Sequence, residues 1–319
     1  MYIELHSRSA FSFLEGSSVP EALMARCAGL GMPAMALLDR DGVYGAPRFH
    51  MAATKAGLKA HIGAEVSSDF SPQRHRGTEN SQQLWENSLY RGGGSNRLLD
   101  HPISRSFDRP IHRLPLLASS RTGYQNLCRL ITKMKLRAAK NEGAVYEQEL
   151  EEHVHGLICL TGGHDGPLAS AFRCGGADAG HHAVERLIRI FGRSNVYVEL
   201  QRHFLREQEL CNRAAIEIAR SLRLPLVATN GVRYATPHDR ELCDVFTAIR
   251  NHRTLSNAGQ LLARNSECHV KSPAEMAELF ADLPEAVENT VELSSRLDFT
   301  LKDLGYEFPR YPVPEGETM

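Results

Sequence analysis

The opening stretch of the chain, residues 1–41, reads MYIELHSRSAFSFLEGSSVPEALMARCAGLGMPAMALLDRD and decides the fold class. Its two apolar runs, Tyr2–Leu5 and Ala34–Leu38, have the length of buried strands. Between them lies a helical pattern, with Ser18 as the predicted N-cap and Gly31 just past the predicted end. The stretch therefore predicts a strand, a helix and a second strand, which is the repeating unit of parallel sheets.

The same alternation continues along the chain. The further predicted strands are Lys59–Val66, Leu114–Ala118, Gly156–Leu160, Asn195–Leu200 and Leu224–Ala228. Further predicted helices cover Arg121–Ala139, His181–Phe191, Phe204–Leu222, Asp239–Ile249, Pro273–Phe280 and Pro284–Leu297. Strands that alternate with helices indicate an α/β protein with a parallel sheet, and seven such units favour a closed or nearly closed (β/α)7 barrel.

Two segments interrupt this pattern, and with them we divide the chain. A barrel domain is expected over 1–236, with a flexible insertion at 67–112 that is polar and has no sustained hydrophobic period. A helical subdomain is expected over 237–300. The prolines of 301–319 predict an extended linker, because proline cannot continue a helix.

Composition excludes several classes of protein. The 319 residues are 42% hydrophobic and 24% charged, as in soluble globular proteins, and the net charge of −1 excludes a basic field over the whole surface. No apolar run reaches the roughly 18 residues of a membrane helix, and the N-terminus has no secretory pattern. Seven cysteines without a CxxC pair support neither a disulfide framework nor a zinc knuckle. We expect a cytoplasmic protein.

Polar residues recur where the predicted strands end, which is the working face of parallel α/β barrels. The polar residues at or near these ends include His6, Arg8, Glu15, Asp39, Arg40, Asp41, Glu65, Arg113, His164, Glu199, His203 and Arg233. Because loops are polar in most proteins, this pattern alone does not separate a functional site from ordinary solvated loops.

The motifs around these residues resemble a known family. Residues 3–16, IELHSRSAFSFLEG, resemble the first motif of the PHP (polymerase and histidinol phosphatase) domain that opens the bacterial C-family DNA polymerases. Residues 30–39 (LGMPAMALLD) and 62–65 (IGAE) resemble its second and third motifs. The later landmarks are GYQNL at 123–127, VATN at 227–230 and LFADLPEAVENT at 279–290. The run YQNLCRLIT at 124–132 resembles the error-prone branch rather than the replicative alpha subunit.

The resemblance implies a distorted, TIM-barrel-like (β/α)7 PHP barrel, in which competent members hold up to three divalent metals with nine side chains. Three of these positions are retained, and they are His6, Glu15 and Glu65. The other six fall on Arg8, Arg40, Arg113, Gly163, Gly231 and Arg233. Arginine offers a metal no lone pair. The resemblance therefore implies a vestigial site without catalytic or metal-binding residues, and no cofactor is expected; Zn, Mn or Mg would bind only if the site still functions.

Three further histidines lie near lost positions. His112 adjoins Arg113 on a strand and should face the other way, His164 lies on a loop within reach, and His203 is more typical of a structural histidine. In place of metals, we expect at least two of the four arginines to pair with Glu15, Asp39 or Glu65. Arginines left without a carboxylate could hold a sulfate or a phosphate.

The resemblance implies the N-terminal PHP domain of an error-prone DNA polymerase that acts in translesion synthesis and repair, with a mainly structural role. Its partners would be the palm, fingers and thumb of the polymerase, DNA through the full polymerase, and the sliding clamp and other translesion proteins. The palm would follow the proline-rich tail, so the chain itself is expected to lack a nucleotidyl-transfer site; an excised domain, a truncated product and a split polymerase all stay open. The alternative is a free-standing metal-dependent phosphoesterase or 3′–5′ exonuclease, which a complete ligand set would favour.

Overall fold

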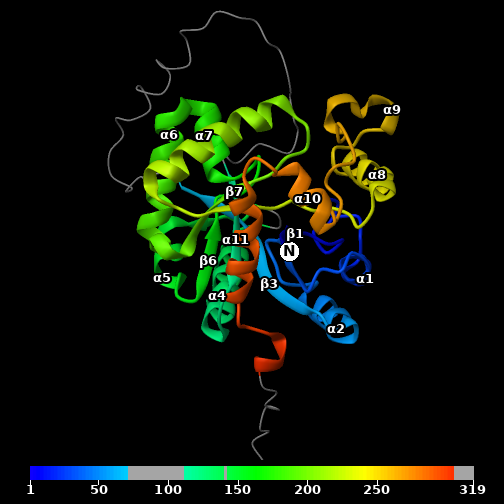
Figure 1. Cartoon of the computed structure of the whole chain (residues 1–319), viewed down its shortest axis with the longest axis horizontal. Coiled ribbons are helices and arrows are strands. Elements are labelled where there is room, and N and C mark those ends of the chain that lie inside the picture. Colours follow the sequence, from blue (N-terminus) through cyan, green and yellow to red (C-terminus); the bar gives the residue numbers. More distant parts are fainter. Residues whose placement is uncertain (71–110, 140–141, 305–319) are drawn as a thin grey trace, which may run out of the picture.

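The fold is built around one curled sheet. The computed structural model describes residues 1–70, 111–139 and 142–304. In this part of the chain the sheet has the order β1 (Glu4–Ser7), β2 (Ala34–Arg40), β3 (Lys59–Asp69), β4 (His112–Ala118), β6 (Leu157–Leu160), β7 (Val196–Leu200) and β8 (Leu226–Ala228), with β5 (Val145–Tyr146) beside β3. The sheet is curled (Figure 1), and an isolated bridge between Ser7 of β1 and Val232, which follows β8, brings the two ends of the order close together, in agreement with the predicted TIM-barrel-like α/β fold.

The expectation of a wholly parallel sheet is wrong at β4. This strand runs antiparallel to both of its neighbours, β3 and β6. A short apolar run carries no information about strand direction, and the sequence could not reveal the reversal. Because β4 runs backwards, its first residues lie at the edge where the parallel strands end, and Arg113 stands opposite Ser67 of β3. The reversal thereby brings Arg113 to the end of the barrel at which the parallel strands finish, which we call the mouth.

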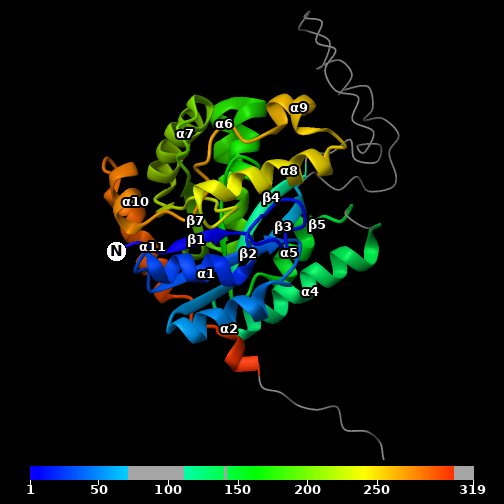
Figure 2. The same ribbon diagram turned by 90° about the vertical axis from the view of Figure 1, so that its right-hand side faces the viewer.

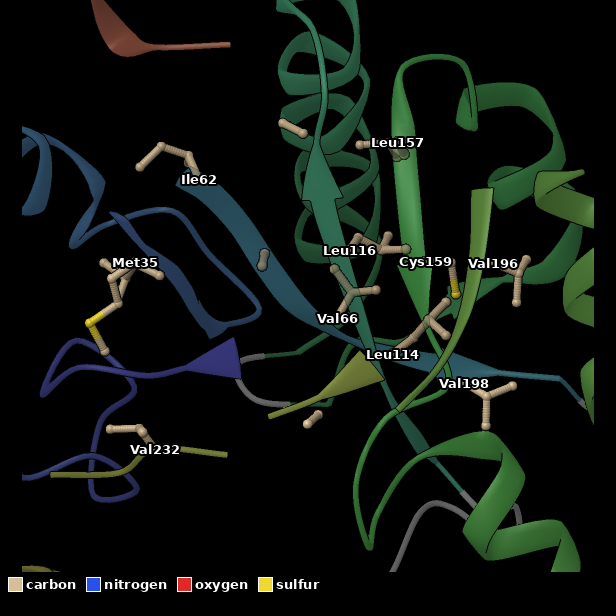
Figure 3. Packing of buried hydrophobic residues seen from close by; sticks show 14 of the residues in the cluster. Met35, Ile62, Val66, Leu114, Leu116, Leu157, Cys159, Val196, Val198 and Val232 are labelled. Atoms are coloured by element: carbon tan, nitrogen blue, oxygen red, sulfur yellow. The ribbon is translucent and has the colours of Figure 1, made fainter. Parts of the chain in front are cut away.

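The strands alternate between an interior and an exterior face. On β2, Ala34, Ala36 and Leu38 belong to the small apolar core inside the barrel, whereas Met35 and Leu37 belong to the larger core between the sheet and its helices. Figure 3 shows part of the larger core, where neighbouring strands contribute apolar side chains. This period of two is the normal geometry of a strand, and it decides which strand-end residues can enter the mouth.

Helices cover the outside of the sheet (Figures 1 and 2). They are α1 (Pro20–Gly29), α2 (Ala46–Ala56), α4 (Arg121–Arg137), α5 (Glu147–His153), α6 (Pro167–Phe191) and α7 (Arg206–Leu222), followed by α8 (Arg240–Arg250), α9 (Leu255–Ala258), α10 (Pro273–Leu279) and α11 (Pro284–Ser295). Single 3-10 turns lie at Arg193–Asn195, Pro237–Asp239, Gly259–Leu261 and Leu301–Leu304. No helix in the described ranges is both long and apolar enough to cross a membrane.

Several boundaries differ from those predicted. The N-cap of α1 is Val19 and not Ser18, whose hydroxyl instead accepts a hydrogen bond from the backbone N–H of Ala235 at 2.8 Å. α6 begins at Pro167, well before the predicted start at His181. A kink at Gly175 and Gly176, the latter with a φ of +72°, divides the helix, and only the part after the kink was predicted. The helices α2, α5 and α9 and the strand β5 were not predicted.

The predicted insertion is too wide at both ends. Residues 67–69 extend β3, and His112 belongs to β4. The rest of the expected insertion, residues 71–110, and residues 305–319 of the expected linker lie outside the described residues.

The end of the barrel opposite the mouth is covered by α11. Leu293 and Leu297 join the interior core, and the backbone N–H of Ile3 donates a hydrogen bond to Thr290 at 3.1 Å. His61 of β3 lies 2.7 Å from the Ser294 hydroxyl, and burial lowers its pKa to about 3, so it stays neutral. The last helix of the expected subdomain is thus part of the barrel core; that residues 237–300 form a subdomain stays a prediction.

Candidate functional site

A bulge in β1 aims His6 into the mouth. Glu4 stands opposite Met35 of β2, but Ser7 stands opposite Leu37, so β1 carries one more residue than β2 over this span. In a regular strand Leu5 and His6 would face opposite sides of the sheet. The extra residue changes the direction of the side chains. Leu5 therefore packs in the interior core, and His6 reaches the carboxylates above it.

His6 bridges two buried carboxylates. Its Nδ1 lies 2.7 Å from Glu199 Oε1, and its Nε2 lies 3.3 Å from Glu65 Oε1. The side chain of His6 is 2% exposed and that of Glu199 is fully buried. Burial alone would lower the pKa of His6, but the two carboxylates raise it to about 10. The two carboxylates thus favour the protonated, cationic form of the ring.

Arg8 joins the same group from two residues further along the chain. Its guanidinium Nη2 lies 3.0 Å from one oxygen of Glu65 and 2.8 Å from the other, and its Nη1 lies 3.5 Å from Glu15. Although burial opposes the charged form, Arg8 and His6 hold the pKa of Glu65 well below its usual range. This contact is the first of the arginine–carboxylate pairs that the sequence predicts.

Glu15 gathers arginines from three parts of the chain. Besides Arg8, it contacts Arg40, and Nη1 of Arg250 lies 2.8 Å from its Oε1. Burial acts to raise the pKa of Glu15, but the surrounding arginines lower it. Arg250 comes from α8, which crosses above the β1–β4 side of the sheet in Figure 2. Its role was missed, because no spacing in the sequence connects it to Glu15.

Asp39, the third carboxylate named as a possible partner, does not pair with an arginine. It neighbours Arg40 on β2, and adjacent residues of a strand face opposite sides of the sheet. Its Oδ1 accepts hydrogen bonds from the backbone N–H of Ser9 at 2.8 Å and from the Ser12 hydroxyl at 2.9 Å. Asp41, the next acidic residue, takes the expected role, with Oδ2 lying 3.5 Å from Nε of Arg40.

The remaining two arginines differ from each other. Arg113 contacts the Ser67 hydroxyl, and its Nη1 lies 3.6 Å from Asp41 Oδ2. Arg233 has no hydrogen bond or ion pair from its side chain to any residue in the described ranges. Two of the four arginines thus contact the predicted carboxylates Glu15 and Glu65, one contacts a different carboxylate, and Arg233 has no carboxylate of the described residues within ion-pair distance.

The two glycine positions share one neighbour, Gln201. A Cβ added at Gly163 would lie 2.5 Å from Gln201 Oε1, and one added at Gly231 would lie 2.7 Å from its Nε2. The amide of Gln201 donates a hydrogen bond to Glu199 Oε1 at 2.8 Å. Gln201 therefore fills the space into which side chains at both positions would project. The sequence analysis did not single it out, although its place two residues after Glu199 on the interior face is the available signal.

The three histidines near the positions where ligand loss is predicted are engaged in other contacts. The His112 ring packs against Phe70, with centroids 5.9 Å apart, and His164 Nδ1 lies 3.3 Å from a guanidinium nitrogen of Arg173. His203 is held by Gln208 and by the backbone carbonyl of Asn230. Among the described residues there is no group of three or more His, Cys, Asp or Glu side chains that could hold a metal. The residues present therefore do not fit a metal cluster.

Comparison with known proteins gives the same family from most of the chain. The PHP domain model matches residues 4–203. Two similar curated proteins are an error-prone DNA polymerase from Nocardia farcinica, 33% identical over 99% of this chain, and a DNA polymerase III subunit alpha from Pseudomonas aeruginosa, 31% identical over 99% of this chain. The chain spans 29% of the first and 24% of the second.

Solved structures with a similar fold are more distant. One is described as a metal-dependent phosphoesterase from Bifidobacterium adolescentis, with 12% identity, a TM-score of 0.41, and coverage of 72% of this chain and 86% of that one.

Proposed function

The chain belongs to the PHP domain family, and from this premise we propose that it serves as the N-terminal PHP region of an error-prone C-family DNA polymerase. In this role it acts as a metal-independent structural platform and not as a phosphoesterase. The observation that carries the proposal is the mouth itself, where arginines stand at ligand positions and bind the retained carboxylates Glu15 and Glu65.

Electrostatics supports this reading. Carboxylates gathered in a buried mouth repel one another and lose hydration unless cations are close. In a competent PHP site metals would supply that charge; here Arg8, Arg40 and the His6 imidazolium supply it. A guanidinium carries its charge at every relevant pH and needs no metal supply. The substitution therefore keeps the barrel mouth stable while removing the groups that would activate water.

The choice of the error-prone branch rests on the run at 124–132. Tyr124 of this run stacks on Phe299, with ring centroids 4.8 Å apart, and this contact ties α4 to the segment after α11. The similar proteins include members of both polymerase branches, so the assignment to translesion synthesis and repair is our proposal.

The partners follow from the length of the relatives. Because the chain spans only about a quarter of them, we propose that it works beside the palm, fingers and thumb of a polymerase and meets DNA through that assembly. The sliding clamp and other translesion proteins are further proposed partners, and the cytoplasm is the proposed location.

Metal content tests the central claim. After dialysis against excess zinc, manganese or magnesium and then against buffer, elemental analysis should find less than one bound metal per chain. Hydrolysis of an activated phosphodiester and excision of a DNA 3′ end should stay at the level without protein. Primer extension should appear only when the remaining polymerase polypeptide is added. Two or more tightly bound metals together with hydrolysis would instead establish the phosphoesterase or exonuclease.

A further inference from the structure

Cys268 and Arg233 lie side by side next to the mouth. The backbone N–H of Arg233 donates a hydrogen bond to the carbonyl of Cys268 at 2.9 Å, and the following residues, Tyr234 and His269, form a parallel bridge. In parallel pairing, neighbouring residues project their side chains to the same side. The thiol of Cys268 and the guanidinium of Arg233 therefore share one side of this short pairing.

A histidine approaches the same thiol from another element. His203, which follows β7, has its Nε2 at 3.9 Å from Cys268 Sγ. The ring is fixed on both sides, since Nε2 also lies 3.0 Å from the carbonyl oxygen of Asn230 and Nδ1 lies 3.0 Å from Gln208 Nε2. His203 and Asn230 are buried, so this arrangement is firmly placed.

In the described part of the chain no carboxylate lies within ion-pair distance of the Arg233 guanidinium, and Asp165 and Glu15 act on its charge only from further away. A guanidinium cannot lose its proton in a protein. A cation that is largely removed from water therefore favours the anionic form of the nearest titratable group. Cys268 is that group, and it keeps part of its surface open to solvent.

We propose that Cys268 is a thiolate paired with Arg233 and His203, and that it is the site at which soft electrophiles and hydroperoxides selectively modify this chain. The proposal is independent of the function argued above, because it uses none of the retained ligand positions.

The titration of the surrounding groups supports the geometry. Burial alone would raise the pKa of Cys268, but His203, Arg233 and Arg8 lower it to about 7. The other titratable neighbours are Cys243 on α8 and Tyr234, and burial raises the pKa of both, so they stay neutral. Cys268 is thus the side chain in this group that provides an anion near neutral pH.

The chemistry is that of an activated thiolate. With iodoacetamide, Sγ forms a bond to carbon and iodide leaves with the electrons of the carbon–iodine bond. With a hydroperoxide, Sγ attacks one oxygen and the O–O bond breaks; the thiolate is oxidised to a sulfenic acid, and the peroxide is reduced to water or an alcohol after taking one proton.

The test is the pH dependence of alkylation of the whole folded chain, followed residue by residue by mass spectrometry with isotopically labelled iodoacetamide. Cys211 is the internal control, because it is also partly exposed while burial raises its pKa. Cys268 should reach half of its maximal rate near pH 7 and react at least tenfold faster than Cys211 at that pH. A midpoint for Cys268 equal to that of Cys211 overturns the proposal.

Two variants and one spectroscopic measurement distinguish the ionisation of the Cys268 thiol from its accessibility to the reagent. Arg233→Gln and His203→Gln should each slow alkylation of Cys268 at pH 7 by roughly fivefold while leaving Cys211 unchanged. If Cys268 is not alkylated at all, thiolate absorbance near 240 nm decides, because wild type should exceed Cys268→Ser at pH 7.5. Equal absorbance, or unchanged rates in both variants, contradicts the thiolate.

Discussion

The mouth of the barrel holds two groups of ion pairs that differ in depth. The inner cluster consists of His6, Arg8, Glu65 and Glu199, and the rim cluster consists of Glu15, Arg40, Asp41, Arg113 and Arg250. Glu199 is fully buried, whereas Arg250 of the rim is 45% exposed. Both clusters use the same chemistry of carboxylates and cations, so differences between them report on burial.

Depth changes what an ion pair does for stability. An exposed pair gains little, because water and salt screen its attraction. A buried pair is costly to form, and removing one partner leaves an unpaired charge that water cannot reach. The inner cluster should therefore be indispensable as a unit, while single members of the rim should be replaceable.

The largest effect is expected at Glu65. Glu65→Gln would place an amide where both His6 and Arg8 need an anion, and we expect the free energy of unfolding to fall by about 4 kcal/mol. Urea denaturation followed by circular dichroism measures it. Glu21→Gln is the matched control, because Glu21 pairs with Arg48 at 2.6 Å on the surface. If both variants lose the same small amount, the depth argument fails.

The inner cluster should also give the chain an alkaline limit. The folded pKa of His6, about 10, lies above its ordinary value of 6.5, so its contribution is complete below about pH 6.5 and is lost as the pH rises toward 10. We expect this loss to reach on the order of 3 kcal/mol. Unfolding measured from pH 6 to 10 for wild type and His6→Gln tests it, because groups outside the cluster cancel in the difference. Parallel curves would show that His6 is neutral.

A smaller effect is expected where Gln201 fills the mouth. Gly163→Ala would bring a Cβ against the Gln201 amide, and overpacking of this kind costs about 2 kcal/mol. In the double variant Gly163→Ala/Gln201→Ala the added methyl group has room, so its cost should shrink to about 0.5 kcal/mol. Thermal unfolding of wild type, the two single variants and the double variant measures the four free energies that this comparison needs. If the losses of the single variants simply add, the Cβ at position 163 and the Gln201 side chain do not compete for the same space.

The smallest effect is expected at the rim. Arg250→Gln removes one of three arginines on Glu15 and should lower stability by about 0.5 kcal/mol or less. The loss should disappear in 1 M salt, where exposed pairs are screened, while the loss in Glu65→Gln should persist. A loss in Arg250→Gln that salt does not change would place Arg250 with the inner cluster.

Much of the fold could be predicted from local patterns. All seven predicted strands are present, because a buried strand is a short apolar run whose boundaries show in the chain itself. α2 was missed although it has a proline in its first turn, because its N-cap residue, Gly45, has no side chain to cap the helix. The pairing of Arg8 and Arg40 with Glu15 and Glu65 was predictable from residue types, since these charges recur at strand ends.

The sequence by itself determined the α/β class and the strands, because both depend on residue types and on spacing within one segment. Only the tertiary structure decided that β4 runs backwards and that a bulge turns His6 inward. It also decided that Asp39 faces away from the mouth, while Arg250 arrives at Glu15 from a distant helix. Strand direction, register and contacts between residues more than 200 positions apart depend on how distant segments pack against one another. The local sequence of one segment does not contain this information.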